Sequence, residues 1–274
     1  MRAAIGLLLA AAACSDRSST SNVSANEPEP LSSAAAPRAS SMEASPPEGD
    51  SLLHYRIVDS ATRLPIPCKL TLLGVGNTLD PAFSRSDEPR QETRAIAAYN
   101  RVFVLSGEGS LKVPQGRYTV LVSRGLEWTL VERNLEITAS GAQLEAELDH
   151  VIDTPGWLSA DFHVHASGSF DSKVPMDARV YEFISDGVDM IVSTDHNVVT
   201  DYGPIIETLG ARDVLASMTG DEVTTAYWGH FGVFPLPITG DPPRHGAVLT
   251  RGRTPKQIFD AVRKKVKGAF INVN

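Results

Sequence analysis

Four short segments of the chain carry side chains of the kinds that bind divalent metal ions. They are residues 161–165 (DFHVH), 194–197 (TDHN), 220–222 (GDE) and 229–230 (GH). Five of the seven histidines lie beyond residue 150, and four of those five fall in these segments. Imidazole nitrogens and carboxylate oxygens are the usual protein ligands of zinc and related ions. The pattern therefore predicts one metal site assembled from four parts of the chain.

The first segment places three polar side chains on one face of an expected strand. Side chains at i and i+2 of a strand point to the same side, so Asp161, His163 and His165 should project together. Two imidazoles on one strand form a ready pair of nitrogen ligands. Taken alone, a His-x-His triplet is equally consistent with an incidental repeat.

The other segments strengthen the prediction because each lies at the end or the start of an apolar stretch. Asp195 and His196 follow the expected strand 189–194, and Glu222 follows the expected strand 214–220. His230 begins the next apolar stretch. In α/β barrels, polar residues at the carboxyl ends of strands are usually functional. A carboxylate at the position of Glu222 could bridge two metal ions.

From residue 156 onward, apolar stretches alternate with helix patterns. Strands alternating with helices predict a parallel sheet, here an incomplete (β/α)7 barrel over residues 156–274. The expected strands are 158–165, 189–194, 214–220, 231–236 and 268–273, and the expected helices are 175–186, 203–209 and one opening at Thr254 with a capping-box pattern.

Residues 51–152 predict a different kind of domain. Seven short stretches with alternating polar and apolar residues, separated by turn signals, are typical of a β-sandwich. Residues 59–67 (DSATRLPIP) and 113–120 (VPQGRYTV) resemble the small transthyretin-like or carboxypeptidase-regulatory-like sandwich. The long polar stretch 75–98 is expected to be a loop. The whole chain is therefore expected to be multi-domain, a β-sandwich followed by the barrel portion.

The four metal-binding segments also resemble a known family when taken in order. Residues 163–165, 193–197, 220–225 and 229–231 are similar to the motifs of the PHP (polymerase and histidinol phosphatase) superfamily, with the carbaryl-hydrolase-like (CehA/McbA-like) branch most similar. The resemblance covers about residues 156–274. It implies a distorted (β/α)7 barrel that holds two or three divalent metal ions, Zn, Mn or Fe. The ligands that it implies are His163, His165, Asp171, His196, Glu222 and His230.

The resemblance implies a metal-dependent hydrolase that uses metal-activated water. The substrate would be a small-molecule ester: a phosphoester, or a carbamate or carboxylic ester given the branch. Glu222 would bridge metal ions, and Asp161 or Asp195 could take catalytic positions by orienting a neighbouring imidazole. Amidohydrolases also begin with His-x-His, but Asp195-His196 directly after the second strand fits the PHP pattern better.

The chain departs from the family pattern near its last residue. The family continues after a strand such as 270–274 with a His-Pro pair and closes with Asp-x-His, and this chain has neither. We therefore expect a fragment of the intact enzyme. A second hypothesis is a non-catalytic surface lipoprotein whose β-sandwich binds a glycan or a protein partner.

The first fifty residues predict export and anchoring rather than a folded domain. Arg2 precedes the apolar run 3–13 and then Cys14, a pattern that resembles a bacterial lipoprotein signal over residues 1–14. A lipidated Cys14 would attach the chain to a membrane, as a periplasmic or outer-membrane lipoprotein. The alternative is an ordinary cleaved signal and a secreted protein. Residues 15–50, with ten serines and five prolines, are expected to be a disordered tether.

Composition excludes one class of partner. The net charge of −8 and the pI near 5.4 disfavour a nucleic-acid surface, which needs a basic patch. The chain has two cysteines, so a lipidated Cys14 would leave Cys68 without a disulfide partner. We expect Cys68 to be a small buried residue in a strand.

Overall fold

The computed structural model describes residues 49–83, 94–240 and 244–274. The predicted signal 1–14 and nearly all of the predicted tether 15–50 lie outside the described residues. All described residues belong to one compact unit of the chain. Within them, no helix is long and apolar enough to cross a membrane.

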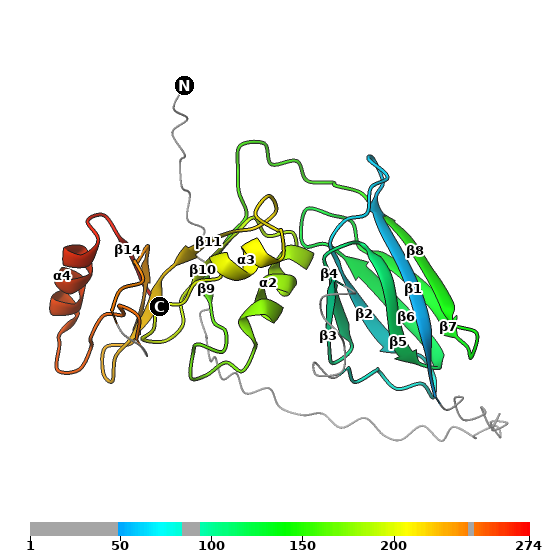
Figure 1. Cartoon of the computed structure of the whole chain (residues 1–274), viewed down its shortest axis with the longest axis horizontal. Coiled ribbons are helices and arrows are strands. Elements are labelled where there is room, and N and C mark those ends of the chain that lie inside the picture. The colour runs from blue at the N-terminus through cyan, green and yellow to red at the C-terminus, as the bar shows by residue number, and fades with distance from the viewer. Residues whose placement is uncertain (1–48, 84–93, 241–243) are drawn as a thin grey trace, which may run out of the picture. The chain divides into compact units, whose positions relative to one another are not determined.

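The first part of the described chain forms two sheets (Figure 1). One has five strands in the order β3-β4-β2-β6-β7, and the other has three in the order β5-β1-β8. Neighbouring strands are antiparallel except β1 and β8, which are parallel. The strands are β1 (Asp50–Asp59), β2 (Cys68–Gly74), β3 (Ala95–Ala98), β4 (Arg101–Val104), β5 (Glu108–Pro114), β6 (Gly116–Ser123), β7 (Val131–Ile137) and β8 (Ala142–Leu148).

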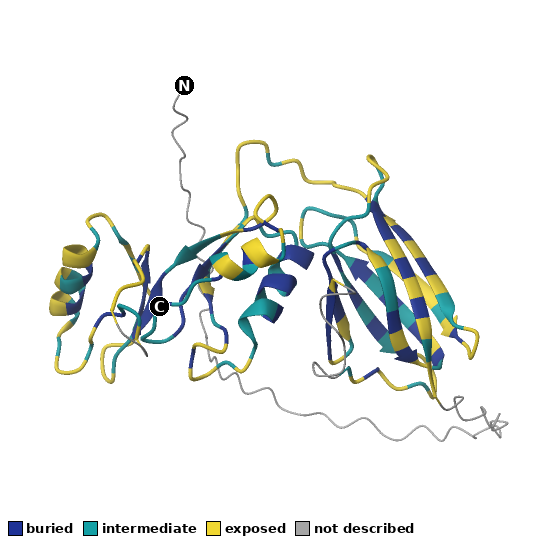
Figure 2. Cartoon of the chain, in the orientation of Figure 1, coloured by how far each residue is buried: buried dark blue, intermediate teal, exposed yellow. Residues whose placement is uncertain are grey.

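The two sheets share one hydrophobic core because their strands alternate between buried and exposed residues. Along β1, Leu53, Tyr55 and Ile57 are buried while the residues between them are exposed. Figure 2 shows this alternation as dark blue and yellow stripes along the strands. Side chains of both sheets, including Leu70 of β2 and Leu144 of β8, belong to the same core cluster.

The second part contains two smaller sheets and three helices. A parallel sheet has the order β11-β10-β9, and an antiparallel sheet has the order β12-β13-β14. Helix α4 begins with the predicted capping box of Thr254 and Gln257, which is confirmed. The elements are β9 (Ala160–Val164), α2 (Met176–Ser185), β10 (Met190–Ser193), α3 (Gly203–Thr208), β11 (Ala216–Thr219), β12 (Asp221–Thr224), β13 (His230–Phe234), α4 (Pro255–Lys265) and β14 (Phe270–Val273).

The prediction of a (β/α)7 barrel, complete or incomplete, is wrong. The described residues contain three helices, too few for such a barrel, and most of their regular structure is strand. After β11 the chain passes directly into β12, and five residues, 225–229, connect β12 to β13. Parallel strands need a crossover of about a dozen residues or more, so this short connection forces an antiparallel hairpin. The apolar pattern predicted strands here but did not reveal their direction.

The predicted loop at 75–98 is also partly wrong. Its last four residues form β3, which pairs with β4 across a tight turn at Tyr99 and Asn100. All four β3 residues are buried, and Ala95 and Ala97 face the core of the two large sheets. Alanine side chains give a weak strand signal in a sequence. For this reason the sequence pattern places residues 95–98 in the same loop as the polar residues before them.

Helix α2 packs against the outer side of β3 and β4. Ile96 and Phe103 of these strands join Val180, Tyr181 and Ile184 of α2 in one buried cluster. The burial of these apolar side chains stabilises the contact by roughly 1.5–3 kcal/mol for each fully buried residue. Helix α2 connects β9 to β10, so the parallel sheet is attached to the larger sheets through a hydrophobic interface.

Cys68 should not react with thiol reagents in the folded protein. Its side chain is fully buried on β2, and burial raises the pKa of the thiol to about 12. At pH 8 about one part in 10⁴ would then be thiolate, against about a quarter for an ordinary cysteine. In a Cys14→Ser chain, an aromatic disulfide reagent should titrate no thiol until guanidinium unfolds the protein. Stoichiometric reaction of the native protein would contradict the buried position.

Gly125 should be essential for the contact between the larger sheets and the end of α2. A Cβ at this position would lie 2.0 Å from the backbone oxygen of Asp186, and the residue has φ +75°. Gly156 has a similar φ of +83° but open space around its Cβ direction. Gly125→Ala should therefore lower the free energy of unfolding more than Gly156→Ala, by about 1–3 kcal/mol beyond the shared φ strain. Equal losses in chemical denaturation would show that the close contact is absent.

Candidate metal centre

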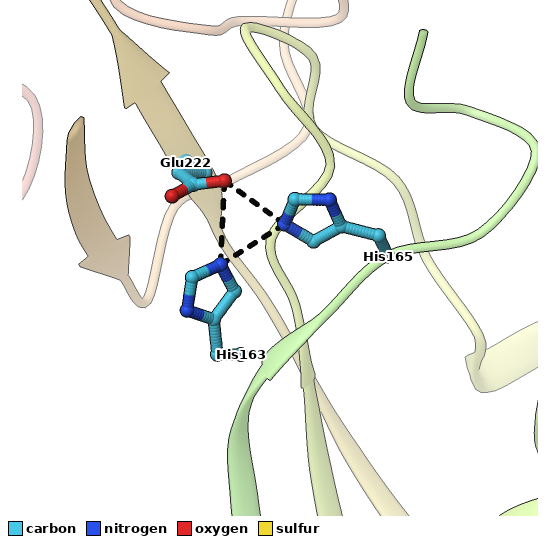
Figure 3. A group of neighbouring side chains, drawn as sticks. All are labelled: His163, His165 and Glu222. Atoms are coloured by element: carbon cyan, nitrogen blue, oxygen red, sulfur yellow. Dashed lines mark hydrogen bonds and ion pairs between the residues drawn. The ribbon is translucent and has the colours of Figure 1, made fainter. Parts of the chain in front are cut away.

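The carboxylate of Glu222 lies at the centre of a cluster of imidazoles. Its Oε2 is 2.9 Å from Nε2 of His165 and 3.0 Å from Nδ1 of His196. The same oxygen is 3.3 Å from Nε2 of His163, and Oε1 is 3.3 Å from Nδ1 of His230. Figure 3 shows His163 and His165 converging on Glu222. The Glu222 side chain is only 4% exposed, so this charged group is held inside the protein by its partners.

Parallel pairing brings the first ligands to one edge of the sheet. Strands β9 and β10 run side by side in the same direction, so the residues that end them or follow them meet. His163 lies on β9 and His165 just beyond it, whereas His196 follows β10. His196 also forms an isolated parallel bridge with Glu222, which joins the end of β10 to β12.

The β12–β13 hairpin places the remaining histidine. Thr224 pairs with His230, and Glu222 pairs with Gly232, in the antiparallel register of these strands. Residues two apart on a strand, such as Glu222 and Thr224, lie on the same face of the sheet. His230 pairs with Thr224 and therefore faces the same side as Glu222. The hairpin therefore brings His230 to the carboxylate.

The loop after β9 brings a second carboxylate to the cluster. Both oxygens of Asp171 are 3.2 Å from Nδ1 of His165, and Oδ2 is 3.3 Å from Nε2 of His196. A hydrogen bond from Ser169 is the main cause that lowers the pKa of Asp171 to about 2; burial opposes it, and the neighbouring His165 and His196 lower the pKa further. Asp171 is therefore ionised at any pH near neutrality.

Glu222 is also held in its charged form. Burial alone would raise the pKa of Glu222, but the Asn274 amide and the imidazoles of His163 and His196 outweigh it. The pKa of Glu222 therefore lies below its ordinary value. Nδ2 of Asn274 donates a hydrogen bond of 2.8 Å to Oε1. An ionised carboxylate among imidazole nitrogens is the arrangement that a divalent cation needs.

The distances fit the coordination of a metal ion. Ligand atoms about 2.1 Å from a tetrahedral ion lie about 3.4 Å from one another, close to the nitrogen–oxygen distances around Glu222. The mixture of imidazole and carboxylate ligands suits zinc, iron or manganese. Three overlapping groups have ligand atoms within 4.8 Å of one another: His163, His165 and Glu222; His165, Asp171 and His196; and His196, Glu222 and His230.

The structure brings together every residue that the sequence singled out as a metal ligand. Each of the six contributes to at least one of the three groups, and Glu222, His165 and His196 contribute to two. The six residues are His163, His165, Asp171, His196, Glu222 and His230.

The two other aspartates in the predicted site have different partners. Asp195 is fully buried, and its oxygens accept hydrogen bonds from the backbone of Ala166 and the hydroxyl of Thr200, at 2.8 and 2.5 Å. Burial raises the pKa of Asp195 against these hydrogen bonds. Asp161 accepts a hydrogen bond of 2.9 Å from the backbone of His163. Both aspartates thus fix the backbone that carries the imidazoles.

Three residues that the sequence analysis missed support the cluster. The hydroxyl of Thr224 lies within hydrogen-bonding distance of Nδ1 of His196. The side chain of Asn197 brackets the backbone of Thr224, accepting from its N–H and donating to its carbonyl at 3.1 and 3.3 Å. Thr224 is two residues from Glu222, so strand alternation could have identified it. Asn274 could not be found in this way, because its position depends on the pairing of β14 with β13.

Open space lies beside the cluster. A hollow of about 330 Å³ is lined by residues that include His163, Arg179 and Phe183. Nε of Arg179 donates a 3.0 Å hydrogen bond to the carbonyl of His165, which places a cation in the wall of this hollow. On another side, the ring of Phe170 is 79% exposed and stacks on His196, with ring centroids 4.6 Å apart. A small molecule can therefore approach the cluster from solvent.

Comparisons with known proteins add little to this geometry. No family model matches the chain, and no curated protein matches it either. Among solved structures, the Bacillus anthracis TIE protein is similar over 36% of this chain, at 16% identity and a TM-score of 0.22. The match spans about 17% of that protein's own length. A likeness this weak identifies neither a fold nor a function for the chain.

Proposed function

We propose that the protein is a metal-dependent hydrolase whose centre is the cluster around Glu222. The observation that carries the proposal is the sharing of this one carboxylate by two groups of histidines. Glu222 forms one group with His163 and His165 and another with His196 and His230. A carboxylate shared in this way is suited to bridge two ions, with Zn, Mn or Fe as the candidates.

The protein's own side chains would hold and orient the ligands. Asp171 faces Nδ1 of His165, which leaves Nε2 of that imidazole directed at Glu222. The low pKa values of Asp171 and Glu222 keep both carboxylates ionised at neutral pH. Bound metal ions supply a hydroxide from water at neutral pH and polarise the scissile group.

The substrate that fits best is a small ester. The hollow beside His163 is open to solvent. Arg179 in its wall is ion-paired with Glu182, so the positive charge that attracts a substrate would come from bound metal ions. Such ions would favour substrates with a phosphoryl or carboxyl-derived oxygen, which covers phosphoesters, carbamates and carboxylic esters. The order of the ligands along the chain, which resembles the PHP motifs, supports the same chemistry, although the barrel expected with it does not form.

Metal binding should depend on the cluster and on no other histidine. After removal of metal and dialysis against zinc or manganese, we expect at least one tightly held ion per chain by elemental analysis. Glu222→Gln or His163→Ala with His165→Ala should weaken binding by more than the roughly 10–100-fold loss typical of outer-shell changes. His54→Ala is the matched control, because His54 is an exposed residue on β1. Equal metal content in all variants would exclude the cluster as the site.

Hydrolysis of esters should require the bound metal ions. We expect the metal-loaded protein to cleave bis(p-nitrophenyl) phosphate or p-nitrophenyl acetate, and chelation or the His163→Ala, His165→Ala double substitution to remove this activity. His54→Ala should leave it intact. If the double variant remained fully active, the assignment of the centre would be wrong. If a protein with intact metal content cleaved neither ester, the centre would be a non-catalytic metal site.

A further inference from the structure

A second cavity lies where the larger sheets meet the end of α2. Its volume is about 450 Å³, within the range of small-molecule sites in proteins. None of its lining residues belongs to the metal centre, so it is a separate feature of the molecule. It is lined by Lys69, Arg124, Gly125, Leu126, Glu127, Trp128, Ser159, Asp186, Gly187 and Val188.

Most of the charged side chains in the wall are already paired. Lys69 forms a 2.6 Å ion pair with Asp186. Glu127 accepts a hydrogen bond of 2.8 Å from Thr154 and lies 3.2 Å from Nε2 of His150. These groups stabilise the wall of the cavity and have little capacity left for a ligand.

Arg124 is the exception. Its Nη1 donates to the carbonyls of Pro67 and Ile184, at 2.7 and 3.3 Å, while its Nε is buried without an acceptor. Nη2 has no hydrogen-bond acceptor among the described residues and, unlike Nε, is not one of the fully buried polar atoms. No carboxylate of the described chain forms an ion pair with this guanidinium. The guanidinium is partly buried and interacts with the charge of Asp189 only from beyond ion-pair distance, so it retains capacity for an anion.

The remaining wall is apolar. The Cζ atom of Arg124 lies over the Trp128 ring, 5.5 Å from the ring centroid. Val188 also lines the cavity. Leu126 stands at the cavity with 94% of its surface exposed, so its side chain is accessible to a ligand. The cavity thus combines one available cation with apolar surface.

We propose that this cavity binds a small monocarboxylate with an apolar body, such as an aryl carboxylate. The carboxylate would accept hydrogen bonds from Arg124, for which planar oxyanions are the preferred partners, and the apolar body would lie against Trp128 and Leu126. A phosphate dianion fits less well, because Lys69 is already neutralised by Asp186 and a single free cation remains.

Binding can be tested with benzoate and its neutral analogue benzamide. The chain has three tryptophans, so a Trp157→Phe, Trp228→Phe background leaves Trp128 as the fluorescent reporter in the cavity. We expect benzoate to change Trp128 fluorescence saturably and benzamide to bind at least about tenfold more weakly, since its neutral carbonyl makes a weaker hydrogen bond to the guanidinium than a carboxylate does. Similar affinities for the two probes, or tighter binding of inorganic phosphate, would overturn the proposal.

Substitution of Arg124 tests whether its charge, rather than the shape of the cavity alone, determines ligand binding. Arg124→Met should weaken benzoate binding by about tenfold or more, and should weaken benzamide binding less, because benzamide carries no charge. Arg133→Met on β7 is the control, because Arg133 is exposed and outside the cavity. Unchanged benzoate affinity in a folded Arg124→Met protein would overturn the proposal. If that variant does not fold, the comparison of benzoate with benzamide in the parent protein still decides the question.

Discussion

The second part of the molecule depends on one buried charge. The Glu222 carboxylate is almost inaccessible to solvent, and an isolated ionised carboxylate in such a place would cost several kcal/mol. Four imidazoles and the Asn274 amide offset this cost, and they come from four separate parts of the chain. Because each partner must reach the same two oxygens, the ends of β9, β10, β12, β13 and β14 are constrained to meet at one place.

Gly220 makes this meeting of two sheets possible. It separates the last strand of the parallel sheet from the first strand of the antiparallel sheet by a single residue. A Cβ here would lie 2.7 Å from the carbonyl oxygen of Val233 and 2.9 Å from that of Ser193. Only a residue without a side chain lets strands of both sheets approach so closely, and Glu222 follows two residues later. The local sequence thus determines how the carboxylate reaches the histidines of β9 and β10.

The ligands could be predicted from the sequence, whereas the fold around them could not. His163 and His165 are related by strand alternation, and His196 follows an obvious apolar strand, so local patterns suffice for them. The direction of β13 and its pairing with β14 are long-range properties that apolar periodicity does not encode. For that reason the sequence predicted a barrel where the chain forms two small sheets. The candidate ligand Asp171 was predicted only through the resemblance to the PHP motifs, and the support from Asn274 was missed.

Helix α2 connects the metal centre with the larger sheets. Near its first turn, Arg179 donates to the carbonyl of His165, and near its last turn the carbonyl of Ile184 accepts from Arg124. The apolar side chains between these points pack on β3 and β4. A helix of ten residues fixed at both ends is effectively rigid, so the position of His165 depends on the docking of α2. The larger sheets therefore contribute to the geometry of the centre without supplying a ligand to it.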